Sequence, residues 1–537
     1  MDGEILLPIT TDIIGKKIGH TISPKGEYCS RPYECWITLH EDFENMAELQ
    51  QSGFVYEILE ERKGDRCLGI VETVRREVDQ DVLGFKLSKK RAMGATVVKL
   101  KVRRTSGLNA PVQDQTDAII PGPDAIALAY QIPGQGIPVG VYALPSGHIF
   151  GPCVVRIPPG FLLGPEAAHL NIGGQTGFGK TAMALLMTKA ILSDGDLAKQ
   201  TCIVAFNVKA DDLLWLEKQN PELTDSDKIL YQALKLPMEP FRPVRIYAPQ
   251  KPLDQKPNSL REDATPFTWE WIDVKTNISY AIAPEDWNPQ LEALLSDLVS
   301  DDNLKEFDDI IGTLIAWIEE AQNQRASWSH GHHIETIRKA LRIFDQGMKV
   351  RLKGLIAGDV NYHLPIDDLT KPYLFSVVDI SRLAISAQRL VIGKIVSEAR
   401  EKIEEGVQSD IKYAIFLSDE LSRYAPKQAP SGPIAEIRRV LDDIAERGRS
   451  VGSIILGVEQ YPSKISDSIT GNVATSIYTR MKMTEMDASL YGGYSRDVKL
   501  LISNLNKGFA VIDNATFTSP IHIAYPRPPC AQRRPKT

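Results

Sequence analysis

The spacing of apolar and polar positions over the first 160 residues predicts short β-strands. Short apolar runs alternate there with breaks that contain Gly or Pro; the runs are "GFVYEIL", "CLGIVETV", "TVVKLKV", "IPVGVYAL" and "PCVVRI". Runs of this length between turn residues are typical of strands in a sheet or a small barrel. We therefore expect an N-terminal β domain over residues 1–160.

From about residue 165, apolar strand candidates alternate with helical patterns. The strand candidates are "HLNIGG", "CIVAFNV", "LFSVVDI", "YAIFLSDE", "SIILGVEQ", "TSIYTRM" and "FAVIDN". After the first of them, Met183, Leu186, Met187 and Ala190 recur at helical spacing, which predicts a helix packed on a sheet. Such alternation is typical of a parallel sheet covered on both faces. We expect an α/β domain over residues 161–520.

The strand pattern stops after about residue 285, and helical stripes replace it. The stripes are Leu291, Leu294, Leu295 and Leu298; Phe307, Ile310, Ile311, Leu314 and Ile318; and the segment "HIETIRKALRIF". They predict a helical subdomain inserted at about residues 285–365. The end of the chain, residues 521–537, is rich in Pro and Arg, so we expect an extended tail that is either frayed or strapped over a neighbour.

Composition narrows the class of protein. The chain of 537 residues is 43% apolar and 24% charged, as in soluble globular proteins, and has no apolar run near the ~18 residues of a membrane span. Its start, "MDGEILLPITTD", lacks the features of a secretory signal. Six cysteines without a CxxC pair favour reduced thiols in a cytoplasmic protein over a disulfide scaffold or zinc site. The net charge of −7 excludes a generally basic nucleic-acid coat protein but allows a local basic channel.

The segment "GQTGFGKT" matches the phosphate-loop pattern G-x-x-x-x-G-K-[ST] between an apolar strand and an amphipathic helix. Its glycines allow the backbone N–H groups to turn inward as an anion cradle at a helix N-terminus. We expect Lys180 to reach the β- and γ-phosphates of ATP and the Thr181 hydroxyl to ligate Mg²⁺. The alternative is a glycine-rich turn without a ligand. The expected nucleotide contacts are Gly174, Gln175, Thr176, Gly177, Phe178, Gly179, Lys180 and Thr181.

Two further strands end in polar residues suited to hydrolysis. "YAIFLSDE" ends in Asp419, expected to hold Mg²⁺ through water, and Glu420, expected to polarise the attacking water. A strand that merely ends in acids is the alternative, but together with a phosphate loop the pair indicates hydrolysis rather than binding alone. "SIILGVEQ" ends in Gln460, which either contacts the γ-phosphate or simply caps its strand.

Three arginines are candidates for a finger that reaches the γ-phosphate held by an adjacent subunit. Arg447 and Arg449 are expected in the turn before the Gln460 strand, without an obvious carboxylate nearby beyond Glu446, and Arg480 ends "TSIYTRM". A solvated or structural role is equally open for each arginine.

Other polar segments favour structural interpretations or stay open. His330, His332 and His333 favour a polar helix start over a metal site, because no partner shows ligand spacing. The segment "NVKADDLLWL", which carries Lys209, either lines a nucleotide or DNA path or is a loop-to-helix transition. The basic stretch Lys86 to Arg104 favours a solvated face over a nucleic-acid patch.

The motifs together resemble those of bacterial HerA-type ATPases, in the HerA–FtsK branch of P-loop motors. The resemblance covers about residues 165–525 and rests, in order, on "HLNIGGQTGFGKT", "FNVKADDLLWL", "LSDELSRYAP", "DIAERGRSVGSIILGVEQYPS" and "GNVATSIYTRM". The first 160 residues resemble the family's N-terminal barrel, which ATP synthase subunits share. In one departure, Ala168 precedes His169 where archaeal relatives tend to carry a basic residue.

The resemblance implies a RecA-like core in a homohexameric ring that translocates on double-stranded DNA by ATP hydrolysis. It also implies a NurA-like nuclease, a sirtuin-like protein or another effector as partner, in DNA end processing or antiviral defence. Carried over by position, Asp419 and Glu420 are the metal-holding and catalytic acids, Gln460 is the sensor, and Arg447 or Arg449 is the finger. Alternatives are a ring scaffold that activates an effector, or a conjugation or secretion ATPase. Arg423 and Lys427 are candidates for DNA contact.

Overall fold

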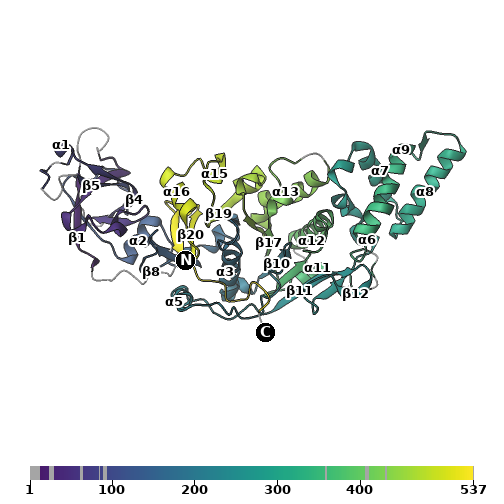
Figure 1. Ribbon diagram of the computed structural model, residues 1–537, viewed down its shortest axis with the longest axis horizontal. Helices are drawn as coiled ribbons and strands as arrows, with labels where there is room; N and C mark the ends of the chain where they lie inside the picture. Colours follow the sequence, from purple (N-terminus) through teal and green to yellow (C-terminus); the bar gives the residue numbers. More distant parts are fainter. Residues whose placement is uncertain are drawn as a thin grey trace.

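The computed structural model is elongated, with a small barrel at one end, a large sheet in the middle and a helical insertion at the other end (Figure 1). It describes residues 13–22, 30–60, 65–83, 85–88, 94–356, 358, 360–405, 410–429 and 432–535. The opening segment "MDGEILLPITTD", Cys29 and residues 89–93 of the basic stretch lie outside these residues. The mixed α/β class predicted from the sequence is confirmed.

A closed antiparallel barrel forms the N-terminal end. Its strands, in spatial order, are β1 (Lys17–Ile22), β2 (Glu34–Leu39), β5 (Ala95–Arg104), β4 (Cys67–Glu77), β3 (Val55–Ile58) and β6 (Asp117–Ile119). The interior is filled by buried side chains such as Ile37, Tyr56 and Leu100, so the barrel has a packed core rather than a channel. The predicted N-terminal barrel is therefore confirmed.

The basic stretch is largely strand β5, and its side chains have partners within the chain. Lys99 pairs with Glu34 at 2.9 Å, and Lys101 donates to the Thr518 carbonyl at 2.6 Å. Arg104 is buried against Glu60 and Asp65. Lys99, Lys101 and Arg104 are thus committed to internal contacts, whereas Lys86 is exposed.

The central sheet has 13 strands, and its middle is parallel. The parallel strands, in spatial order, are β11 (Val244–Lys251), β16 (Phe375–Asp379), β10 (Thr201–Asn207), β17 (Tyr413–Asp419), β18 (Ser453–Glu459), β9 (Ala168–Gly173) and β19 (Val473–Tyr478). On one side the sheet continues, antiparallel, through β20 (Phe509–Asn514), β21 (Ile521–Ala524), β7 (Ile137–Ala143) and β8 (Ile149–Ile157). The runs "IPVGVYAL" and "PCVVRI" therefore complete this sheet rather than the barrel.

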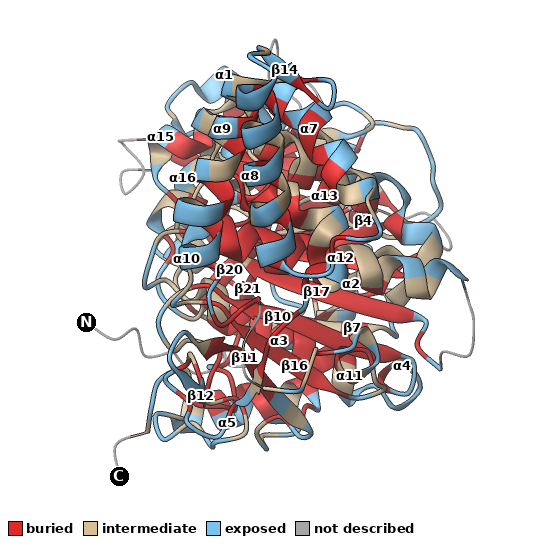
Figure 2. Ribbon diagram, turned by 90° about the vertical axis from the view of Figure 1, so that its right-hand side faces the viewer, coloured by how far each residue is buried: buried red, intermediate tan, exposed pale blue. Residues whose placement is uncertain are grey.

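Helices cover both faces of the parallel strands. Alternate residues of β10 belong to different apolar cores: Ile203 and Ala205 pack in the core with α3 (Lys180–Ser193). Val204 and Phe206 pack in the core with α12 (Ile385–Glu405) and α13 (Pro433–Val451). In Figure 2, β10, β16 and β17 are buried, whereas α8 (Phe307–Asn323) and α9 (Ile334–Arg342) carry exposed outward faces.

The helical insertion lies between β13 (Thr265–Phe267) and β16 and is built on the predicted stripes. Leu291, Leu294, Leu295 and Leu298 are buried in α7 (Pro289–Ser300). His333 caps α9 by accepting the N–H of Glu335. His330 and His332 contact Glu320 and Asp297, and among the described residues no group of three potential metal ligands occurs. His333 therefore lies at the predicted polar helix start, whereas His330 lies in a turn and His332 in the short strand β15 (His332–His333).

Shorter elements connect these units. They include α2 (Pro123–Tyr130), α5 (Asp225–Leu234), β12 (Asp254–Pro257), α6 (Trp271–Val274), α11 (Ile366–Leu369), α14 (Asp467–Asn472), α15 (Met483–Met486) and α16 (Arg496–Asn504). Within the part of the chain that the structure describes, no helix is both long and apolar enough to cross a membrane.

The C-terminal tail is extended and packs on its own chain. The Arg527 N–H donates to Asp227 at 2.9 Å, Cys530 is buried and pairs with Gln219, and the Ala531 N–H donates to the Lys218 carbonyl at 2.9 Å. The predicted tail began too early, because residues 521–524 form strand β21 of the central sheet; only the chain beyond them is extended, and it lies across its own α/β domain.

Candidate functional site

The phosphate loop joins the end of β9 to the start of α3, and its glycines are required by geometry. Gly177 and Gly179 have φ of 82° and 88°, a backbone conformation that residues with a side chain rarely adopt. A Cβ at Gly174 would clash with the Thr479 hydroxyl, whereas one at Gly177 would meet no atom within 4 Å. The space beside Gly177 is thus open, and the first N–H groups of α3 lack helical acceptors. This cradle suits an anion.

Hydrogen bonds to residues at the ends of the neighbouring strands β18 and β19 hold the phosphate loop in place. The Gly174 N–H donates to the Glu459 carbonyl at 3.0 Å, and the Gln175 N–H donates to the Arg480 carbonyl at 2.7 Å. The Gln460 side-chain amide donates to the Thr176 hydroxyl. A pocket of about 300 Å³ adjoins these residues, and Tyr461, Lys482 and Glu485 complete its lining. The structure therefore brings Gln460 directly against the loop.

The acid pair lies at the same carboxyl ends of the parallel strands as the phosphate loop, with β18 between its strand and β9. Asp419 ends β17, and Glu420 follows with φ of 56°, its N–H donating to the Val458 carbonyl at 2.8 Å. Burial raises the pKa of Asp419, against the opposing effect of Lys209 and Lys180. Burial lowers the pKa of Lys180, and Asp419 opposes that shift. These four side chains form one electrostatic unit.

Two residues at this end of the sheet were not assigned a role from the sequence, Lys209 of this unit and Glu459 beside it. Lys209, for which both interpretations stayed open, forms an ion pair with Glu420 and lies 3.6 Å from Asp419. Glu459 was overlooked: its side chain, in a residue only 2% exposed, accepts from the Ser422 N–H at 2.6 Å and the Ser422 hydroxyl at 3.0 Å. Burial, with the nearby acids, raises its pKa to about 8. Both residues follow or end parallel strands whose carboxyl ends meet at this edge, which is the signal that could have identified them.

The three candidate arginines lie in different places. Arg447 and Arg449 lie in the last turns of α13, not in the turn before β18, because the helix continues to Val451. Arg447 pairs with Asp443 at 3.0 Å, a carboxylate one turn back that the sequence interpretation missed. They lie near the start of the seven-residue strand β18, roughly 20 Å from its phosphate-loop end.

Arg480, in contrast, lies beside the phosphate loop of its own chain. Its guanidinium carbon is 5.1 Å from the centre of the Phe178 ring. A cation over an aromatic face at this distance is attracted by the ring quadrupole. The contact fixes Phe178 and Arg480 together at the loop.

His169 fills a structural place between β9, β18 and α13. Its Nδ1 accepts from the Ile455 N–H at 3.1 Å, so Nε2 carries the proton and donates to the Ala445 carbonyl at 3.1 Å. Burial lowers its pKa to about 4. Burial likewise lowers the pKa of His522 to about 4, and its Nδ1 lies 2.8 Å from the Ala143 carbonyl. Both imidazoles are held neutral.

These histidines predict a loss of stability in acid. An unfolded His has a pKa of about 6.5, so the unfolded chain binds more protons as the pH falls from 6.5 to 4. The free energy of unfolding is therefore unaffected by these histidines above pH 6.5 and falls as the pH drops towards 4, by up to about 3 kcal/mol for each histidine. Urea unfolding at pH 7, 6, 5 and 4 measures it. In His522→Asn, whose amide can donate to Ala143, the pH dependence should flatten; an unchanged slope would contradict the assignment.

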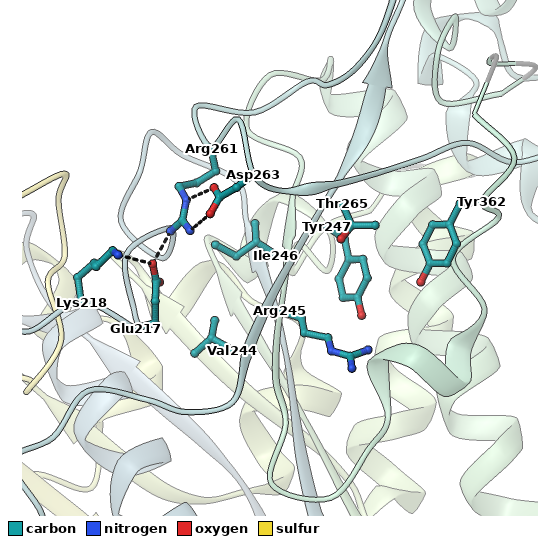
Figure 3. A pocket seen from close by; sticks show the side chains of 10 residues that line it. All are labelled: Glu217, Lys218, Val244, Arg245, Ile246, Tyr247, Arg261, Asp263, Thr265 and Tyr362. Carbon is teal, nitrogen blue, oxygen red and sulfur yellow. Dashed lines mark hydrogen bonds and ion pairs between the residues drawn. The ribbon is translucent and has the colours of Figure 1, made fainter.

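A separate pocket of about 590 Å³ lies at the outer edge of the sheet, beside β11 (Figure 3). Arg261 spans Asp263 and Glu217 there, and Tyr247 and Tyr362 stand nearby with their rings 6.5 Å apart. Its lining contains neither the phosphate loop nor the acid pair. The pocket is therefore distinct from the candidate nucleotide site.

Comparison with known proteins supports the resemblance drawn from the motifs. No family model matches the chain. It is 26% identical over 228 residues to the DNA double-strand break repair helicase HerA of Pyrococcus furiosus, a match that covers 37% of this chain and 40% of that relative. The predicted resemblance to HerA-type ATPases is therefore confirmed, and it spans less than half of the relative's length.

Solved structures with a similar course of the chain have low sequence identity. VirB4 of Thermoanaerobacter pseudethanolicus has a TM-score of 0.43 at 13% identity, covering 73% of this chain and 97% of its own. Plasmid coupling protein TrwB in complex with ADP and Mg²⁺ has a TM-score of 0.44 at 14% identity, covering 75% of this chain and 93% of its own.

Proposed function

We propose that this chain is an ATP-hydrolysing motor that works as a homohexamer and translocates on double-stranded DNA. The observation that carries the proposal is the meeting of the phosphate loop, the acid pair and Gln460 at one edge of the parallel sheet. The similarity to HerA supports DNA as the substrate. A nuclease or sirtuin-like effector, in DNA end processing or antiviral defence, completes the proposed role.

The residues present fit ATP and Mg²⁺. The open space beside Gly177 and the unpaired N–H groups of α3 suit phosphate oxygens. The Thr181 hydroxyl and the Asp419 carboxylate are hard oxygen donors of the kind that Mg²⁺ prefers. When bound, Mg²⁺ neutralises phosphate charge and orients the β- and γ-phosphates. Asp419 and Thr181 are thus the proposed metal contacts.

The chain's own side chains supply the remaining chemistry. Lys180 places positive charge on the phosphates, while Glu420 accepts a proton from the attacking water as the bond from the γ-phosphorus to ADP breaks. Gln460, held against Thr176, would report the state of the γ-phosphate to the residues that follow it.

The candidate arginines lie at opposite ends of the parallel strands. Arg480 lies at the loop of its own chain. Arg447 and Arg449, at the far edge of the sheet, could serve only a phosphate loop of another subunit. Arg447 or Arg449 is therefore the proposed finger in trans, a role that requires the proposed ring assembly.

Linear duplex DNA should stimulate ATP turnover by the wild-type protein. Because phosphate contacts release counterions, the stimulation should fall steeply, by roughly tenfold or more, between 50 and 200 mM salt. Turnover is measured with and without DNA across this range. Turnover that ignores DNA at every salt concentration would refute the motor and favour a ring scaffold with regulatory hydrolysis.

A further inference from the structure

Glu420 is held by two cations from two different segments. Lys209, after β10, pairs with its Oε1, and Arg423, in the short turn after the acid pair, pairs with its Oε2. Lys209 also lies 3.6 Å from the Asp419 carboxylate. Each carboxylate oxygen therefore has a cation beside it, although the buried Oε2 accepts no hydrogen bond from the residues that the structure describes. Moving Arg423 away would free Oε2 for the attacking water.

Arg423 is the partner that an external ligand can reach. Its side chain is 45% exposed, whereas the Glu420 side chain is 19% exposed. Lys209 belongs to the inner unit with Lys180 and Asp419, since each influences the pKa of Asp419. Arg423 is bound to that unit through Glu420 and is otherwise directed towards solvent. Releasing it leaves the charges around the phosphate loop in place.

Arg423 belongs to a local basic patch, defined here as Arg423, Lys427 and Lys464. The Lys427 N–H donates to the Lys464 carbonyl at 2.7 Å, and Pro426 pairs with Ile465, so the two segments form one surface. All three side chains are exposed, and Lys427 forms an ion pair with Asp467 at 2.8 Å. A polyanion bound at this patch would compete with Asp467 for Lys427, as it would with Glu420 for Arg423.

The patch is also linked to the phosphate loop. Lys464 lies over the Tyr461 ring, with its Nζ 4.6 Å from the ring centre. Tyr461 follows Gln460, which contacts Thr176. A ligand on the patch thus touches two segments that both lead to the nucleotide site, one through Glu420 and one through Gln460.

We propose that Arg423 is a positioning residue that holds Glu420 at rest, and that the phosphates of duplex DNA release Glu420 by drawing Arg423 away. The inference rests on the proposed function and adds how DNA would switch hydrolysis on. Arginine suits this exchange because its planar fork binds carboxylate and phosphate in the same way. The ion pair with Glu420 and the contact with DNA are then mutually exclusive.

The test is ATP turnover by Arg423→Gln with and without linear duplex DNA. Loss of a partly exposed ion pair should raise kcat without DNA about 2- to 5-fold, leave KM for ATP unchanged and shrink the stimulation by DNA. Arg423→Lys, which keeps the charge but loses the planar fork, should raise DNA-free kcat less than Arg423→Gln does. Arg439→Gln is the matched control, because Arg439 pairs with Glu436 three residues before it, as Arg423 does with Glu420, but on α13.

A second measurement uses the wild type alone and does not depend on a variant folding. Salt screens exposed ion pairs, so DNA-free turnover should rise modestly from 50 to 200 mM salt while stimulation by DNA falls. Unchanged or lower DNA-free turnover in Arg423→Gln would overturn this inference while DNA stimulation of the wild type stands. Absence of that stimulation would instead refute the proposed motor.

Discussion

Replacing Glu420 with Gln should lower ATP turnover by about 10²- to 10⁴-fold while ATP still binds. The amide keeps the size of the side chain but cannot accept the proton of the attacking water. Glu420 also forms two ion pairs, so its replacement could lower stability as well as remove the base. The lost turnover is assigned to the base only if the variant unfolds at a temperature close to that of the wild type.

The measurement is steady-state phosphate release with saturating ATP, beside calorimetric binding of a non-hydrolysable analogue. Glu436→Gln is the matched control, because Glu436 has the same ion-pair spacing on α13 and lies outside the acid pair. Turnover within threefold of the wild type in Glu420→Gln would assign the base to another residue.

Replacing Lys180 with Ala should weaken ATP binding by roughly 10- to 150-fold, the effect of losing hydrogen bonds to a charged partner. Burial lowers the pKa of Lys180, so this side chain is desolvated at a cost in the nucleotide-free protein. Its removal should therefore leave the free energy of unfolding without nucleotide unchanged or higher.

Calorimetric titration with an ATP analogue and thermal unfolding without nucleotide measure the two effects separately. Lys199→Ala, an exposed lysine that pairs with Asp196, is the control and should match the wild type in both. Unaltered affinity in Lys180→Ala would exclude the loop as the phosphate site.

The sequence predicted those parts of the site that depend on local pattern. The phosphate loop and the acid pair each follow one apolar strand, and consecutive residues carry their whole signal. The helical stripes of the insertion, such as Leu291 and Leu294, were equally local. Parallel strands then bring their carboxyl ends together, which is why Gln460 meets the loop.

What the sequence did not predict depends on contacts between distant segments. Lys209 pairs with Glu420, and Glu459 accepts hydrogen bonds from Ser422. Both contacts depend on which strands are neighbours in the sheet, and the spacing of apolar residues does not reveal that order. Arg447 was misplaced because the residue pattern before β18 contains a Gly, and helix α13 nevertheless continues through Gly448 to Val451.

The pairing of β7 with β21 has a consequence for how the chain is made. The His522 ring of β21 contacts the Ala143 carbonyl of β7, 379 residues away along the chain. At about 5–20 residues per second, β7 leaves the ribosome roughly 20 to 75 s before its partner strand. During synthesis the hairpin of β7 and β8 presents an unpaired edge, and an unpaired edge is a template for aggregation. Folding of this sheet is therefore completed only after translation of the last strand, and cellular yield should depend on chaperones that shield the waiting hairpin.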